Sequence, residues 1–250
     1  MKTRHANNRA LLIGLLCVWQ AASLLAQNLL INGSFEAGNT GFSSDYTYAP
    51  GNLGPEGTYD VSRNPRDSHA LAASFTDHTS GTGFMLVVNG AADTNRVVWR
   101  QSVGLTMNTP YEFSGWAASW GNDGTGHDPN PARFRLSING SAVGPAFQLS
   151  NLDGQWQGFS VPWSSIASGS ALIELRLETA ALIGNDPAFD DLALVAVPEP
   201  KTMALIGLGI VVLVTRRLRP NKSLQPTPGR RCSSAARFTS PGPAWLSSDR

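Results

Sequence analysis

The chain has 250 residues, of which 42% are hydrophobic and 15% charged, and its formal net charge is +1. This length suits one or two domains, and the apolar fraction is ample for a sizeable core. Two cysteines exclude a disulfide-dense scaffold and a multi-cysteine zinc module. The small net charge argues against a strongly basic nucleic-acid binder, and we predict no nucleic-acid partner, but the net figure is misleading because it hides how the charges are distributed.

The charges are segregated along the chain. Residues 1–26 carry three basic residues and no acid, residues 27–197 carry seven arginines and 16 acids, and residues 198–250 carry nine basic and two acidic residues. Three segments of such different charge are expected to have three different roles.

The first segment has the order of a secretory signal. Lys2, Arg4 and Arg9 precede an apolar run over residues 10–18, and small residues follow up to Ala26. The run is too short for a comfortable membrane span, so residues 1–26 are predicted to be a signal peptide, with an uncleaved N-terminal anchor as the alternative. The middle segment lacks cysteine and must fold outside the cytoplasm without disulfides.

The residue pattern of the middle segment, residues 27–197, predicts one all-β domain. Apolar residues alternate with polar ones in short runs, and before residue 203 no stretch of twelve keeps a helical period. Asn89-Gly90 and Asn139-Gly140 each follow an apolar run, as in tight hairpin turns. The predicted strands lie at 29–36, 58–61, 70–75, 84–88, 97–105, 111–120, 134–138, 146–149, 156–161, 172–177 and 189–195. This number of short strands favours a sandwich or barrel.

The C-terminal side has a Pro-Glu-Pro triplet, an apolar run and arginines. Pro198, Glu199 and Pro200 precede the run at 203–214, and Arg216 and Arg217 follow it. Twelve residues reach about 18 Å as a helix, short of a hydrocarbon core of about 30 Å, so we predict a short, weak membrane helix. The arginines place the C-terminus inside and the middle segment outside.

This arrangement resembles the PEP-CTERM sorting signal of Gram-negative bacteria over residues 198–219. The resemblance implies processing by an exosortase, a transient stay in the inner membrane, and release to the cell surface or the exopolysaccharide matrix. An ordinary membrane tail is the alternative. Residues 220–250, rich in Pro, Ser and Arg, are predicted to be a disordered basic extension, or sequence translated beyond the natural stop.

The middle segment is similar to carbohydrate-binding modules with a galactose-binding-like jelly-roll fold. The likeness rests on the opening residues 28–36 and the closing residues 189–194, with internal matches at 98–103, 111–116 and 154–160. It implies a jelly-roll β-sandwich whose first and last strands lie near each other.

The same resemblance implies a structural Ca²⁺ shared by those two strands. Its ligands would be Glu36 from the first strand and Asp190 from the last, with Asp191 as a second candidate. Neighbouring residues of a strand face opposite ways, so one aspartate is expected to bind the ion while the other meets water. Ca²⁺ takes six to eight hard oxygen ligands, and it would compensate an aspartate on a core-facing side. The alternative is that both aspartates cap a solvated strand end.

Sugar recognition uses aromatic platforms with amide and carboxylate groups. If Tyr111 and Phe113 face the core, Trp116 and Trp120 form an exposed platform, whereas a bulge at Gly115 would bury them. Core packing is the competing role for any single tryptophan. The loop after Trp120 offers Asn122, Asp123, His127 and Asp128 to a sugar or a second Ca²⁺, or is a plain surface loop.

The motifs of an enzyme are missing from the sequence. The histidines of the middle segment are scattered, and neither a Gly-x-Ser-x-Gly elbow nor a phosphate-binding loop occurs. We therefore expect an exported, non-catalytic surface or matrix protein that binds a polysaccharide. The alternatives are a structural protein of the same fold without sugar affinity and an unrecognised polysaccharide-acting enzyme.

Overall fold

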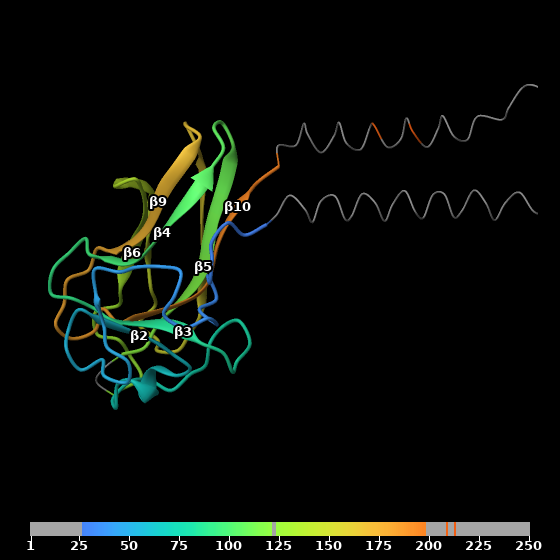
Figure 1. The fold of residues 1–250 in the computed structure, drawn as a ribbon. Coiled ribbons are helices and arrows are strands. Elements are labelled where there is room, and N and C mark those ends of the chain that lie inside the picture. The colour runs from blue at the N-terminus through green and yellow to red at the C-terminus, as the bar shows by residue number, and fades with distance from the viewer. Residues whose placement is uncertain (1–26, 122–123, 199–208, 210–212, 214–250) are drawn as a thin grey trace, which may run out of the picture.

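The computed structural model describes residues 27–121 and 124–198, together with residues 209 and 213. They form two β-sheets, shown in Figure 1. The six-stranded sheet has the order β1-β2-β3-β10-β5-β8, with bounds β1 Thr47–Tyr48, β2 Thr58–Ser62, β3 Met85–Asn89, β10 Pro187–Ala196, β5 Pro110–Ser119 and β8 Gln157–Ser164. The four-stranded sheet has the order β4-β9-β6-β7, with bounds β4 Val97–Leu105, β9 Gly169–Leu177, β6 Arg133–Ile138 and β7 Ser141–Gln148. The predicted all-β sandwich is confirmed.

Period-two alternation builds the core between the sheets. Trp99 and Val103 of β4 face inward against Phe113 of β5, while Arg100 and Ser102 face outward. Both sheets contribute to one continuous apolar cluster that contains Phe134, Phe159 and Phe189 in edge-on ring contacts. Burial of these large side chains is the main stabilising term, at about 25 cal/mol per Å² of apolar surface.

A second, smaller core lies on the outer side of the six-stranded sheet. Met85 and Val87 of β3 and Ala188 of β10 are fully buried there, although they face away from the main core. The segment between β1 and β3 covers them with Leu53 and Ala72. This part of the sheet is therefore buried on both faces.

The opening segment lies beside β10, as the resemblance implied, but it is not a strand. The N–H of Leu29 donates to the carbonyl oxygen of Leu194 (2.8 Å), and the N–H of Leu192 donates to the carbonyl oxygen of Gly33 (2.9 Å). Between and after these contacts the chain turns, with positive φ angles at Asn32 and Phe35. The prediction of a strand over 29–36 was therefore wrong, because the residues hold β10 at two points and bend away between them.

Two further local predictions failed. Residues 70–75 form turns and extended backbone that cover the small core instead of a strand. Asn89-Gly90 does not close a hairpin, because β3 and the following β4 belong to different sheets. Asn139-Gly140 does join β6 to β7 as a two-residue turn, with φ angles of 51° and 78°. The two-residue strand β1 was not predicted.

Several predictions concern residues that the structure does not describe. The signal peptide at 1–26, the extension at 220–250, and Glu199, Pro200, Arg216 and Arg217 lie outside the described residues, as do Asn122 and Asp123. Pro198 is described and follows β10 in irregular backbone. Among the described residues, no helix is long and apolar enough to cross a membrane.

Gly33 should not tolerate a side chain. A Cβ atom placed on it would lie 2.0 Å from the carbonyl oxygen of Leu192, which belongs to rigid backbone. We expect Gly33→Ala to lower the free energy of unfolding by about 1–3 kcal/mol, the usual range for overpacking. Urea denaturation measures the change.

The matched control is Gly104→Ala, because a Cβ atom there meets nothing within 4 Å. Gly104 lies in β4, where alanine is not inferior to glycine, so this variant should be neutral or slightly stabilised. Equal stabilities of the two variants would contradict the close approach of the opening segment to β10.

Candidate functional site

Trp116 lies on the outer face of the six-stranded sheet. Tyr111 and Phe113 are 4% and 1% exposed, and β5 pairs with β8 in unbroken register from Pro110 to Ala117, so there is no bulge at Gly115. Trp116, of opposite parity, is 36% exposed. The side chain lies near Gly158 of the edge strand β8, whose lack of a side chain leaves room for the indole ring.

Trp120 does not join Trp116 in a platform. It is fully buried in the small core, and its Nε1–H donates to the carbonyl oxygen of Val88 at 2.9 Å. Its side chain does lie on the face of the sheet that is turned away from the main core, as the period-two pattern predicted. The prediction of exposure was wrong because Leu53 and Ala72 cover the sheet at that position.

Trp116 instead belongs to an aromatic cluster with residues from other parts of the chain. The imidazole of His78 stacks on its indole, with ring centroids 3.9 Å apart and planes inclined by 17°. Trp156 meets His78 edge-on at 5.9 Å and Phe75 at 5.7 Å. We call these four residues, Phe75, His78, Trp116 and Trp156, the aromatic shelf. Trp156 is held by its Nε1–H, which donates to the carbonyl oxygen of Thr76 at 3.0 Å.

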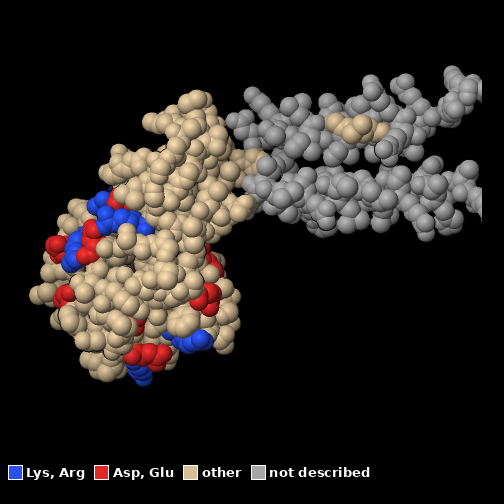
Figure 2. Space-filling view, viewed as in Figure 1, with Lys and Arg blue, Asp and Glu red and all other residues tan. Residues whose placement is uncertain are grey.

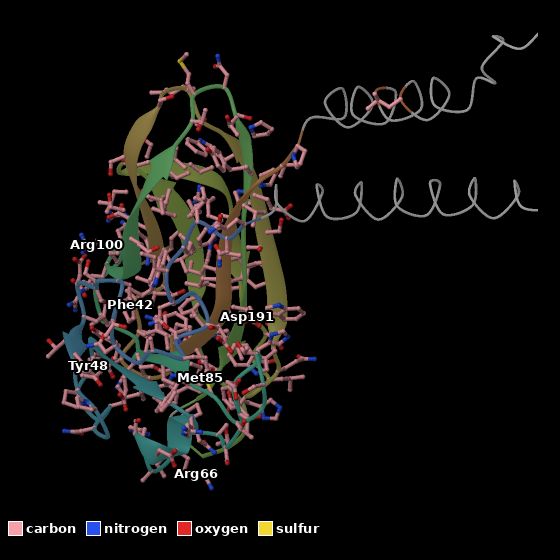
Figure 3. All side chains as sticks on the ribbon, turned by 45° about the vertical axis from the view of Figure 1, so that its right-hand side comes forward. Phe42, Tyr48, Arg66, Met85, Arg100 and Asp191 are labelled. Carbon is pink, nitrogen blue, oxygen red and sulfur yellow. The ribbon has the colours of Figure 1, made fainter. Side chains whose placement is uncertain are left out.

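Two aspartates of β10 anchor His78 and give the shelf a polar border. Nδ1 of His78 lies 2.7 Å from a carboxylate oxygen of Asp191, and Oγ1 of Thr79 lies 2.6 Å from the other. Asp190 is fully buried, and its Oδ2 accepts from the backbone N–H groups of His78 (2.9 Å) and Thr79 (3.0 Å). Asp191, labelled in Figure 3, is about one-third exposed and lies across the sandwich from Arg100.

The bulge in β10 separates the roles of these aspartates. The register against β5 shifts between Asp190 and Ala193, and Asp191 has a positive φ of 50°. Asp190 therefore points into the protein while Asp191 reaches the surface. The expectation that one of the two meets water and the other is enclosed agrees with this geometry.

Five of the six carboxylate oxygen atoms of Glu36, Asp190 and Asp191 accept hydrogen bonds from protein groups or lie within hydrogen-bond distance of them. Glu36 is exposed, and its Oε1 accepts from the N–H of Phe84 at 3.0 Å. Both carboxylate oxygens of Asp190 accept backbone N–H groups. Within residues 27–121 and 124–198, no group of three or more His, Cys, Asp or Glu residues is arranged to hold a metal ion. Glu36, Asp190 and Asp191 do not make a joint ligand set in this arrangement, and Ca²⁺ stays a prediction.

Two other buried acids were not singled out as a pair by the sequence. Asp128 and Asp186 are 1% and 0% exposed, and each has one carboxylate oxygen without a hydrogen-bond partner. Burial raises the pKa of both groups, and the negative charge of Asp128 adds to the rise at Asp186. Asp128 follows the exposed His127 in the predicted surface loop, so only the fold shows that its carboxylate is enclosed.

The four-stranded sheet carries a different kind of surface. Its outer face holds a polar groove of about 280 Å³, lined by Asn95, Arg135, Arg176, Glu178 and neighbouring residues of the β6–β7 hairpin. Arg135 contacts Glu178 at 2.6 Å, and Arg176 contacts the buried Glu174 at 2.8 Å. The arginines are thus neutralised by acids of the same face. Figure 2 shows charged side chains of both signs gathered on the lower part of the molecule.

Sequence reasoning missed the part played by His78, Thr79 and Phe75. His78 is one of three scattered histidines in the middle segment. No residue near it in the sequence indicates that its partner is Asp191, more than 100 residues away. The one available signal was the dense polar stretch Thr76-Asp77-His78-Thr79-Ser80 between two apolar segments.

Asp190 should make the stability of the protein depend on pH. Burial raises the pKa of its carboxyl from 3.8 to about 6, against hydrogen bonds from Thr79 and the N–H of Asp191 that lower it. Since the folded state then holds the proton more tightly than the unfolded state, the stabilisation is complete below about pH 4 and is lost as pH rises to about 6. The loss is at most about 3 kcal/mol.

Asp190→Asn removes this titration. Urea denaturation at a series of pH values should therefore show a shallower fall in stability between about pH 4 and pH 6 for the variant than for the unmodified chain. Parallel curves would show that Asp190 does not titrate in this window.

A calcium titration followed by melting temperature tests the predicted ion. If Glu36 is a ligand, Ca²⁺ should raise the melting temperature of the chain after EDTA treatment, and Glu36→Gln should abolish that rise. A rise that survives in Glu36→Gln would exclude the predicted ligand set, as would a melting temperature that Ca²⁺ does not change.

Comparison with known proteins gave one sequence match and several structural likenesses. No curated protein matches the chain. The sandwich is similar to a xylan-binding CBM22 domain of Paenibacillus barcinonensis Xyn10C, with a TM-score of 0.45 and 17% identity over 66% of this chain and 92% of that one. It is similar to TmCBM61, solved with β-1,4-galactotriose, with a TM-score of 0.45 and 15% identity. This likeness covers 68% of this chain and 99% of TmCBM61. It is also similar to the arabinofuranosidase MgGH51, with a TM-score of 0.47 and 14% identity. This likeness covers 69% of this chain and 26% of the arabinofuranosidase.

The sequence match lies just after the last strand. Residues 196–219 match the PEP-CTERM protein-sorting motif, which agrees with the predicted 198–219. The motif implies export with processing by a membrane exosortase. The chain thus contains a β-sandwich followed by a PEP-CTERM protein-sorting motif.

Proposed function

We propose that this is an exported, non-catalytic protein whose β-sandwich binds a glycan at the aromatic shelf. The observation that carries the proposal is the stack of His78 on the half-exposed Trp116 beside Trp156. Aromatic side chains that reach the surface and are fixed by hydrogen bonds are the usual platform for the apolar faces of sugar rings.

The polar border of the shelf suits sugar hydroxyl groups. The carboxylate of Asp191 accepts hydrogen bonds, and the hydroxyl group of Thr79 both donates and accepts. His78 is held against Asp191, so its ring is pre-oriented and little side-chain entropy remains to be lost on binding. β8 is an edge strand, and a polymer can therefore extend beyond the shelf without meeting another strand.

The charge of the domain favours a neutral glycan over an acidic one. Residues 27–197 contain 16 acids and seven arginines, and the shelf itself is bordered by an aspartate. A polysaccharide rich in uronic acids would be repelled at this site. Together with the sorting motif, this supports a role at the cell surface or in the extracellular matrix, with a neutral exopolysaccharide as the partner.

The state of the carboxyl groups at the shelf supports the non-catalytic part of the proposal. A glycosidase needs two carboxyl groups that flank a bond of the substrate. At the shelf Asp190 is fully buried, with both oxygens accepting backbone N–H groups, and only Asp191 reaches the surface. A structural protein without sugar affinity is the alternative that a binding experiment decides.

Trp116→Ala should weaken glycan binding at least tenfold, because the His78 stack loses its support. The change would be measured by glycan array and by affinity electrophoresis against neutral polysaccharides. Tyr48→Ala serves as the control, since Tyr48 is similarly exposed at 42% but lies in β1, outside the shelf. Melting temperatures of both variants show whether the fold is kept.

Three outcomes would reject the proposal. One is the absence of binding to any glycan by the unmodified chain. Another is equal binding by Trp116→Ala and Tyr48→Ala. The third is loss of binding in Arg176→Ala but not in Trp116→Ala, which would move the site to the polar groove of the four-stranded sheet.

A further inference from the structure

One end of the sandwich is free of charged residues. It consists of the β4–β5 turn at 106–109, the β6–β7 turn at 139–140, the β8–β9 turn at 165–168 and the exit of β10 at 197–198. The described segments 102–111, 137–149, 155–173 and 192–198, which form these turns and the strand residues next to them, contain no Asp, Glu, Lys or Arg, and the first charged residue along β5 is Glu112. We call this the charge-free end, and it is the uncoloured upper end in Figure 2.

Hydrogen bonds connect the three turns of this end with one another or with a neighbouring strand. The N–H of Asn108 donates to the carbonyl oxygen of Ser165 (2.9 Å), and the N–H of Met107 donates to Oγ of Ser168 (2.8 Å). The N–H of Asn139 donates to the carbonyl oxygen of Leu172 (2.9 Å). The end is therefore a defined surface built from both sheets.

Large apolar side chains protrude from this surface. Ile166 is 88% exposed, the most exposed large apolar residue of the sandwich, and Met107 is 52% exposed. Trp163 lies partly buried beneath them and stacks with Tyr111 at 6.1 Å. Single exposed apolar residues are ordinary on protein surfaces, so exposure alone does not identify a partner.

The path of the chain identifies the partner. The N–H of Val197 donates to the carbonyl oxygen of Pro110 (2.8 Å), so β10 leaves the sandwich at the charge-free end. The opening residues emerge beside it, through the bond from Leu29 to Leu194, and Figure 1 shows both ends of the domain on this side. The apolar run of the sorting motif begins at Met203, six residues after Val197, which is about 20 Å of fully extended chain.

This distance decides which end faces the membrane. β5 and β10 have ten residues each and span roughly 33 Å, so the charged far end of the sandwich lies beyond the reach of a 20 Å connection. Anionic headgroups repel a domain with an excess of nine acids, and they repel the charge-free end least. Apolar side chains at such an end enter the headgroup region favourably.

We propose that the charge-free end rests on the lipid bilayer while the chain is held by its sorting segment, with Ile166 and Met107 entering the headgroup region. In this orientation the shelf and the charged far end face away from the membrane. The proposal uses the sorting motif and does not depend on glycan binding.

The test uses the full chain in vesicles of phosphatidylcholine and phosphatidylglycerol, with Cys17→Ser and Cys232→Ser as background. An environment-sensitive fluorophore is attached through Ile166→Cys, through Met107→Cys, or through the control Leu182→Cys. Leu182 is 66% exposed in the β9–β10 loop at the opposite end. Lipids brominated on the acyl chains then quench fluorophores that enter the bilayer.

We expect quenching at positions 166 and 107 to be several-fold stronger than at position 182, with a blue shift of emission only at the first two. Ile166→Asp should reduce the quenching at position 107. Equal quenching at positions 166 and 182 would overturn the proposal. So would a chain that does not float with the vesicles, because the orientation requires a tethered chain.

Discussion

The structure depends on the pairing of β10 with successive partners. One side of β10 pairs with β5 along nearly its whole length, whereas the other side pairs first with β3 and then with the opening segment. The bulge at Asp190 and Asp191 lies where the partner changes. There the side-chain carboxylate of the buried Asp190 accepts hydrogen bonds from the backbone N–H groups of His78 and Thr79. These hydrogen bonds hold His78 beside Trp116, so the aromatic shelf is a consequence of how the sheet is completed.

This domain buries several aspartate side chains without a positively charged partner. Asp128, Asp186 and Asp190 are all enclosed, and burial raises the pKa of each. Hydrogen bonds from backbone groups, not arginine or lysine, are the partners given to Asp186 and Asp190. Such acids hold loops in one geometry at a cost in stability near neutral pH. A domain without disulfides must meet this cost from its two apolar cores.

Charge and apolar surface divide the sandwich along its length. The acids and arginines lie over the polar groove, the loops around Asp128 and Asp186, and the border of the shelf, while the end from which β10 leaves has none. In the orientation proposed above, electrostatic repulsion and the short connection to the apolar run of the sorting motif act in the same direction. Glycan binding at the shelf and contact with lipid at the charge-free end would then use separate surfaces.

The sequence by itself determined the all-β class, the presence of the nine strands β2 to β10, the Asn139-Gly140 hairpin and the sorting motif. These rest on local or periodic signals, namely alternation of period two, turn residues with positive φ, and an ordered motif. It also placed Trp116 outward by strand parity. Only the tertiary structure decided that Trp120 is buried, that residues 29–36 bend instead of forming a strand, and that His78 joins the site. Parity tells which side of a sheet a residue faces, but a loop distant in sequence determines whether that side is solvent, and such long-range packing leaves no periodic trace in the chain.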